Sequence, residues 1–104
     1  MAGEFGTRFM DKMVISHFAD GWSEAQIVPS DSISLHPGAH VLHYASTCFE
    51  GLKAFRQDDG SVAVFRMDKN VARFAQSSEL LYLPRIDQAQ TARMITQIVS
   101  LFRD

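Results

Sequence analysis

One short span of the sequence, residues 43–56 (HYASTCFEGLKAFR), concentrates the side chains that could do chemistry. It holds an imidazole, a phenol, a thiol, a carboxylate and two cations among large apolar residues, a mixture that suits neither a plain core strand nor a plain surface loop. Such a conflict between local rules is expected at functional sites. Residues 43–56 are therefore the first candidate for a functional site.

Two side chains in this span could act in catalysis, and each has a second interpretation. The thiol of Cys48 with His43 as its base would form a nucleophilic pair, but no third group is evident that would orient the imidazole. A small buried thiol in the core is the other interpretation of Cys48. Glu50 is either a general base or one half of an ion pair. The residues alone leave both choices open.

Three histidines, His36, His40 and His43, have the i, i+4, i+7 spacing that would place them on one face of a helix and imitate a metal site. Pro37 and Gly38 disfavour that helix. No cysteine or carboxylate lies at a fitting interval, so no metal site is predicted. We expect these side chains to be loop histidines that are satisfied by hydrogen bonds.

Composition excludes several classes of partner. The 104 residues allow one small domain, and a net charge of −2 offers no broad positive surface for nucleic acid. No apolar run approaches the roughly 20 residues of a membrane span.

The six glycines are dispersed and form no phosphate-binding loop. The single Cys48 cannot form an intrachain disulfide, which favours a cytoplasmic location.

Two hairpins are predicted. Asp20-Gly21 is a turn signal between the β-rich run 10–18 and a strand at 25–28. A second hairpin is expected over residues 52–66, around Asp58-Asp59-Gly60. If Asp59-Gly60 forms a two-residue turn, Lys53 lies opposite Arg66 and the two cations repel each other. A bound anion would remove that penalty, whereas a bulge or splayed side chains would keep the two cations apart.

Two helices are predicted to cover this antiparallel sheet, which gives an α+β fold. The first, at about 68–82, has Asp68 as its expected N-cap and an apolar side that includes Val71 and Phe74. The second, at about 87–103, begins with a capping box of Asp87 and Gln90. The pattern alone would make Arg73, on another side of the first helix, a solvated surface residue.

The combination LHYASTCFEGLKAFRQDDGSVAVFRMDKNVARF resembles the N-terminal part of the branched-chain amino acid aminotransferases, pyridoxal-phosphate enzymes of class IV (fold-type IV). The family pattern is HY, a gap of four residues, FEG, a hydrophobic residue and Lys or Arg, a hairpin, FR and an N-x-x-R helix. Residues 43–73 match it in order and spacing. The runs FGTRFMDKM and IVPSDSISLHPGAHVLHY extend the resemblance over nearly the whole chain, with one departure at Lys12, where His is common.

The resemblance implies a role for six residues. Arg73 matches the arginine that binds the cofactor phosphate, a role that suits a guanidinium fork. It also implies a homodimer, because the residue that Tyr44 matches reaches the active site of the partner subunit. The residues that match the substrate side of the site are Phe49, Gly51 and Lys53, with Phe5 as a further apolar wall.

The implied function is that of the enzyme's small N-terminal domain, residues 1–104, without the domain that carries the catalytic lysine. The whole enzyme would use pyridoxal phosphate to transfer the amino group of Leu, Ile or Val to 2-oxoglutarate. None of Lys12, Lys53 and Lys69 lies in the family's Schiff-base motif, so we expect the isolated chain to be inactive. Alternatives are a relative of D-amino-acid aminotransferase or aminodeoxychorismate lyase, and a non-catalytic dimerisation or interaction module.

Overall fold

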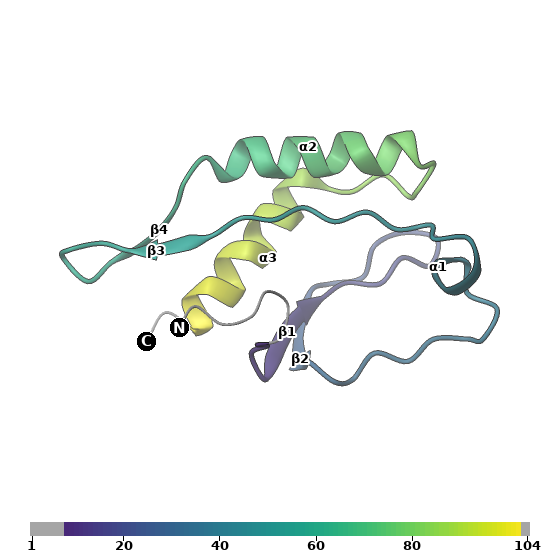
Figure 1. Ribbon diagram of the computed structural model, residues 1–104, viewed down its shortest axis with the longest axis horizontal. Helices are drawn as coiled ribbons and strands as arrows, with labels where there is room; N and C mark the ends of the chain where they lie inside the picture. The colour runs from purple at the N-terminus through teal and green to yellow at the C-terminus, as the bar shows by residue number, and fades with distance from the viewer. Residues whose placement is uncertain (1–7, 103–104) are drawn as a thin grey trace.

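The computed structural model describes residues 8–102, which contain four short strands and three helices (Figure 1). The predicted α+β class is confirmed, but the strands form two separate two-stranded antiparallel sheets, β1–β2 and β3–β4. The elements in chain order are β1 (Lys12–Ile15), β2 (Gln26–Pro29), α1 (His40–His43), β3 (Ala54–Arg56), β4 (Val62–Val64), α2 (Met67–Leu80) and α3 (Gln88–Leu101).

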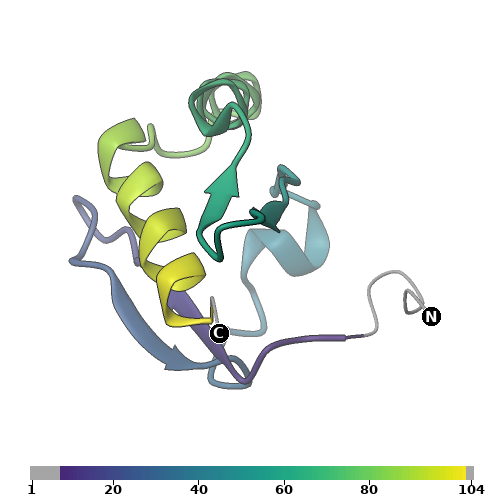
Figure 2. The same cartoon turned by 90° about the vertical axis from the view of Figure 1, so that its left-hand side faces the viewer.

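Helix α3 is the central element of the fold, since it packs on α2 and on β1 (Figures 1 and 2). Trp22, in the turn of the first hairpin, donates its indole N–H to the carbonyl oxygen of Arg85 at 2.7 Å, and Gln90 of α3 donates to the carbonyl oxygen of Ser23 at 3.0 Å. These two bonds join the first hairpin to the start of α3. The side chain of Gln90 therefore does not complete the predicted capping box, although Asp87 accepts from the Gln90 backbone N–H at 3.0 Å as expected.

The second hairpin has a register one residue away from the predicted one. Ala54 pairs with Val64 and Arg56 with Val62, because the loop contains three residues, 58–60, and not two. Gly60 has a φ of +90° and its N–H bonds to the carbonyl of Gln57, the geometry of a turn followed by a bulge. Lys53 and Arg66 are consequently not a cross-strand pair, because the two-residue turn on which that pairing depended is not formed.

The start of α2 also differs from the expected one. The helix begins at Met67, and its N-cap is Arg66 in the left-handed conformation, with φ of 53°. Asp68 is therefore not the N-cap but an acidic residue in the first turn, where its charge favourably meets the positive end of the helix dipole. The left-handed residue turns the chain from β4 into α2, so the predicted hairpin-to-helix order is kept.

Little of this fold is fully buried. Among the described residues, only Val71 and Ser78, both on α2, have side chains inside the core. The accessible surface of 8477 Å² exceeds the roughly 5,900 Å² expected for a folded monomer of this mass. The radius of gyration is 15.1 Å, compared with about 13 Å for a compact chain of this length. The elements thus form an open frame with apolar faces accessible to other groups.

Candidate active site

The candidate site lies where the extended segment between α1 and β3 runs antiparallel to α2 (Figure 1). Near one end of this run, the thiol of Cys48 lies 3.4 Å from the hydroxyl of Ser78. Further along it, the carboxylate of Glu50 meets Asn70 and Arg73, which are near the start of α2. These contacts fix the segment against the helix over two turns.

Arg73 and Glu50 form a two-point ion pair. The Nε–H of Arg73 donates to Oε1 of Glu50 at 2.8 Å, and Nη2 donates to Oε2. The Arg73 side chain is 66% exposed, whereas that of Glu50 is 13% exposed. The hydrogen bonds from Arg73 and Asn70 hold the pKa of Glu50 below its usual value, and the same carboxylate raises the pKa of Arg73. Glu50 is therefore one half of an ion pair, one of its two predicted interpretations.

Asn70 connects this ion pair to the next residue of the extended segment. Its side-chain amide donates to Oε2 of Glu50 and to the carbonyl oxygen of Gly51, both at 3.0 Å. An amide nitrogen carries two hydrogens, so both bonds can form at once. Asn70 had no role assigned from the sequence. Its signal was the i, i+3 spacing with Arg73, which puts both side chains on one face of the helix.

The ion pair leaves part of the Arg73 guanidinium available to a ligand. A guanidinium has five N–H donors in one plane, and Glu50 takes two of them along the Nε–Nη2 edge. The other donors, on Nη1 and Nη2, face away from this carboxylate. A phosphate oxygen pair matches that remaining edge in shape and charge. The residues present therefore fit a phosphate-bearing cofactor.

A cavity of about 340 Å³ adjoins the ion pair. Its polar wall is made by Glu50, Gly51 and Asn70, and its apolar wall by side chains of the segment, α2 and α3. The wall residues are Leu52, Val71, Phe74, Thr91 and Ile95. The cavity thus places a charged group beside an apolar surface, the combination that a small amphipathic ligand requires.

The predicted substrate-side residues lie on either side of Glu50 along the chain. Phe49 is 89% exposed, and Lys53 is also exposed, just before β3. Gly51 is bonded through its carbonyl to Asn70. Tyr44 follows α1, is 73% exposed and stacks at a tilt against His40, with ring centroids 5.0 Å apart. Phe5 lies outside the described residues.

The possible nucleophilic pair of Cys48 and His43 is not formed. The imidazole of His43 bonds to the carbonyl oxygen of Pro37 at 2.6 Å, and Cys48 contacts Ser78. Nδ1 of His36 accepts the Gly38 N–H at 2.9 Å, so His36 is a loop histidine satisfied by a hydrogen bond as expected. His40 and His43, in contrast, lie in the short helix α1, so the prediction that they are loop histidines is wrong. Among residues 8–102, no three His, Cys, Asp or Glu side chains gather as a metal-ion site.

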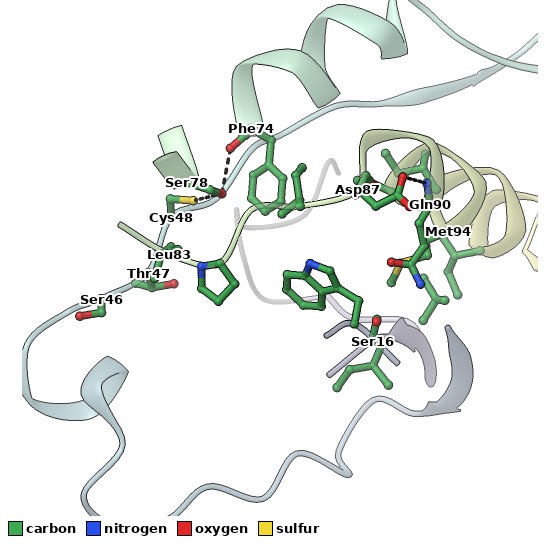
Figure 3. A pocket seen from close by; sticks show the side chains of 18 residues that line it. Ser16, Ser46, Thr47, Cys48, Phe74, Ser78, Leu83, Asp87, Gln90 and Met94 are labelled. Carbon is green, nitrogen blue, oxygen red and sulfur yellow. Dashed lines mark hydrogen bonds between the residues drawn. The ribbon is translucent and has the colours of Figure 1, made fainter. Parts of the chain in front are cut away.

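A larger groove of about 530 Å³ shares Phe74, Thr91 and Ile95 with the cavity of about 340 Å³. Figure 3 shows Cys48 and Ser78 on one side of it and Asp87, Gln90 and Met94 on the other. Most of its lining is apolar, from β1, α2, α3 and the connection between the helices. The groove is therefore an open apolar feature of a fold that has few buried residues.

Within the described part of the chain, no helix has the length and apolarity to cross a bilayer.

Comparison with known proteins shows that the chain is similar to a part of proteins named branched-chain-amino-acid aminotransferases. It is 39% identical to branched-chain-amino-acid aminotransferase 2 of Bacillus subtilis over 102 residues. This alignment covers 96% of this chain and 28% of the relative. It is 50% identical over 84 residues to a probable branched-chain-amino-acid aminotransferase of Streptomyces coelicolor, covering 79% of this chain and 23% of the relative. No protein-family profile matches the chain.

The same relationship extends to animals. The cytosolic branched-chain-amino-acid aminotransferase of Rattus norvegicus is 38% identical over 102 residues, which cover 96% of this chain and 25% of the relative. The chain is thus homologous to a part of the aminotransferases, and more narrowly of the branched-chain-amino-acid aminotransferases, as the sequence motifs predicted. It spans about a quarter of the length of the relatives it matches.

Proposed function

We propose that the chain acts as the small, N-terminal part of a pyridoxal-phosphate-dependent branched-chain aminotransferase, which transfers the amino group of Leu, Ile or Val to 2-oxoglutarate. The observation that carries this proposal is the identity of 38–50% to enzymes of that name over most of the chain. These names favour it over a D-amino-acid aminotransferase or an aminodeoxychorismate lyase. The free edge of the Arg73 guanidinium, whose shape and charge suit a phosphate, also supports it.

In this proposal Arg73 is the cofactor anchor. The bound pyridoxal phosphate supplies the electron sink for amino-group transfer. The exposed edge of the Arg73 guanidinium donates to the phosphate oxygens, while its other edge stays on Glu50. The contribution of this chain is thus to bind and orient the phosphate end of the cofactor.

The substrate side is proposed to follow the extended segment. The ring of Phe49 offers an apolar surface to a branched aliphatic side chain, and Lys53 places a cation nearby. Gly51 permits close approach, because a Cβ built on it has no atom within 4 Å. Phe5 adds a further apolar wall, and Tyr44 reaches the site of a second subunit in a homodimer. Its 73% exposure supports a role at an interface, and the proposed location is the cytoplasm.

Binding of a cofactor analogue tests this proposal. Pyridoxine 5′-phosphate lacks the aldehyde that would react with surface lysines, and pyridoxine also lacks the phosphate, so the two differ only in the group that Arg73 would hold. The expected result in an NMR titration is tighter binding of the phosphorylated form, with that advantage lost in Arg73→Ala. Equal binding of the two compounds to the wild-type chain would contradict the proposal.

A second candidate function, an interaction module, is favoured by the apolar groove of about 530 Å³. Trp22 is the only tryptophan of the chain and lines this groove, so its fluorescence reports directly on an occupant. Self-association through the groove would shift the Trp22 emission to shorter wavelength as the protein concentration rises, together with an increase in mass by light scattering. Concentration-independent mass and emission would contradict it.

A further inference from the structure

The contacts of Glu50 and Asn70 suggest more than the packing of a loop on a helix. Glu50 is the less exposed partner of the ion pair and bonds Arg73 through both of its carboxylate oxygens. Two parallel hydrogen bonds fix the plane of a guanidinium, which one bond would leave free to rotate. The direction of the remaining donors of Arg73 is therefore set by Glu50.

Asn70 relates this arrangement to the substrate side. Its amide donates to Oε2 of Glu50 and to the carbonyl oxygen of Gly51, so it bridges the ion pair and the segment that carries the proposed substrate wall. Asn70 and Arg73 are one turn apart on the rigid helix α2. The phosphate anchor and the Gly51 backbone are thereby held at a fixed separation by the side chains of Glu50 and Asn70.

We propose that Glu50 and Asn70 are positioning residues. They hold the free edge of the Arg73 guanidinium toward the cofactor phosphate and keep it at a fixed distance from the Gly51 backbone. This inference rests on the proposed function, because it assigns these two residues to the same cofactor site. It adds a directional role to a carboxylate that could otherwise act only as a competitor of the phosphate for Arg73.

The opposite effect of charge makes the inference testable. A neighbouring carboxylate repels a phosphate, so a purely electrostatic role predicts that Glu50→Gln binds pyridoxine 5′-phosphate more tightly. A positioning role predicts that it binds more weakly, because the guanidinium loses its fixed plane. The two roles therefore give changes of opposite sign in the same titration.

The test compares affinity for pyridoxine 5′-phosphate with affinity for pyridoxine by NMR titration. We expect Glu50→Gln to lower the phosphate advantage roughly tenfold and Asn70→Ala roughly threefold. The matched control is Glu79→Gln on α2, which removes the same charge from an exposed ion pair with Arg85, in the connection between α2 and α3, and should leave the advantage unchanged. The charge swap Glu50→Arg with Arg73→Glu restores an ion pair but should not restore phosphate binding.

The outcomes separate this inference from the proposed function. If Arg73→Ala lowers the phosphate advantage but Glu50→Gln leaves it unchanged or raises it, the positioning role is overturned and the anchor remains. If Arg73→Ala itself has no effect, the proposed function fails and the positioning role fails with it. Amide NMR spectra of each variant show whether it is folded, and a variant that weakens both compounds equally counts against positioning.

Discussion

Arg73 of α2 donates two hydrogen bonds to Glu50, which lies 23 residues earlier in an extended segment without regular secondary structure. The pair joins a helix to a loop, and Asn70 adds a third bond to the same carboxylate at 3.0 Å. A surface ion pair alone contributes little to stability, but a bidentate pair in a network contributes more. The Glu50 carboxylate therefore joins this loop to two residues of α2.

Acid should weaken the fold through Glu50. Its pKa is lowered from its usual value of 4.5 by the hydrogen bonds from Arg73 and Asn70, so the folded state binds this proton less readily than the unfolded state. The stabilisation is therefore complete above the unfolded pKa and is lost as the pH falls through the lower folded pKa. Urea unfolding followed from about pH 3 to about pH 7 should show this loss.

Glu50→Gln should flatten part of that acid dependence. A second part should remain, because the side-chain and backbone bonds from Ser61 also lower the pKa of Asp59. If the unfolding free energy of Glu50→Gln falls with pH as steeply as that of the wild type, the ion pair is not formed in solution. The raised pKa of Arg73 adds no dependence in this range, since its charge is lost only in strong alkali.

Two glycines should respond differently to alanine. Gly60 has a φ of +90° in the three-residue loop, so Gly60→Ala should cost about 1 kcal/mol of unfolding free energy. Gly51 has no positive φ and no atom within 4 Å of a built Cβ, so Gly51→Ala should leave stability unchanged. Chemical denaturation of both variants measures the difference. A destabilised Gly51→Ala variant would show that other atoms pack against Gly51 in solution.

The small core should depend strongly on Val71, which is 4% exposed. Val71→Ala removes two buried methyl groups and should lower the unfolding free energy by roughly 2 kcal/mol. Leu80→Ala is the matched control on the same helix, because Leu80 is 74% exposed and its change should stay within about 0.5 kcal/mol. Equal costs at the two positions would mean that another face of α2 is buried in solution.

Local patterns in the sequence predicted the two hairpins and the two long helices, but not the short helix α1 or the contacts between elements. The Asp87 cap and the turn around Asp58–Gly60 follow from short-range rules, and both are present. The one-residue shift in register arose because a three-residue loop with a bulge and a two-residue turn suit the same residues. The left-handed Arg66 had no signal in its residue type, since non-glycine residues rarely adopt that conformation.

The contacts of the candidate site were predicted in part. Glu50 as one half of an ion pair was one of two interpretations, and the helix pattern made Arg73 a surface residue, as its exposure shows. The cofactor role of Arg73 comes from the family motif and stays a prediction. The bridge from Asn70 to Gly51 depends on how a loop lies on a helix, and it connects residues 19 apart in the chain. No local rule specifies that distance, so Asn70 received no role from the sequence.

The free edge of the Arg73 guanidinium is the proposed anion-binding site. The most direct measurement is the ¹⁵N NMR signal of the Arg73 side chain during titration with pyridoxine 5′-phosphate, with pyridoxine as the reference ligand. We predict that the Arg73 signal shifts with the phosphorylated compound, shifts much less with pyridoxine, and that the signal of the exposed Arg85 stays unchanged. An unchanged Arg73 signal, or equal shifts at Arg73 and Arg85, would contradict anion binding at this edge of Arg73.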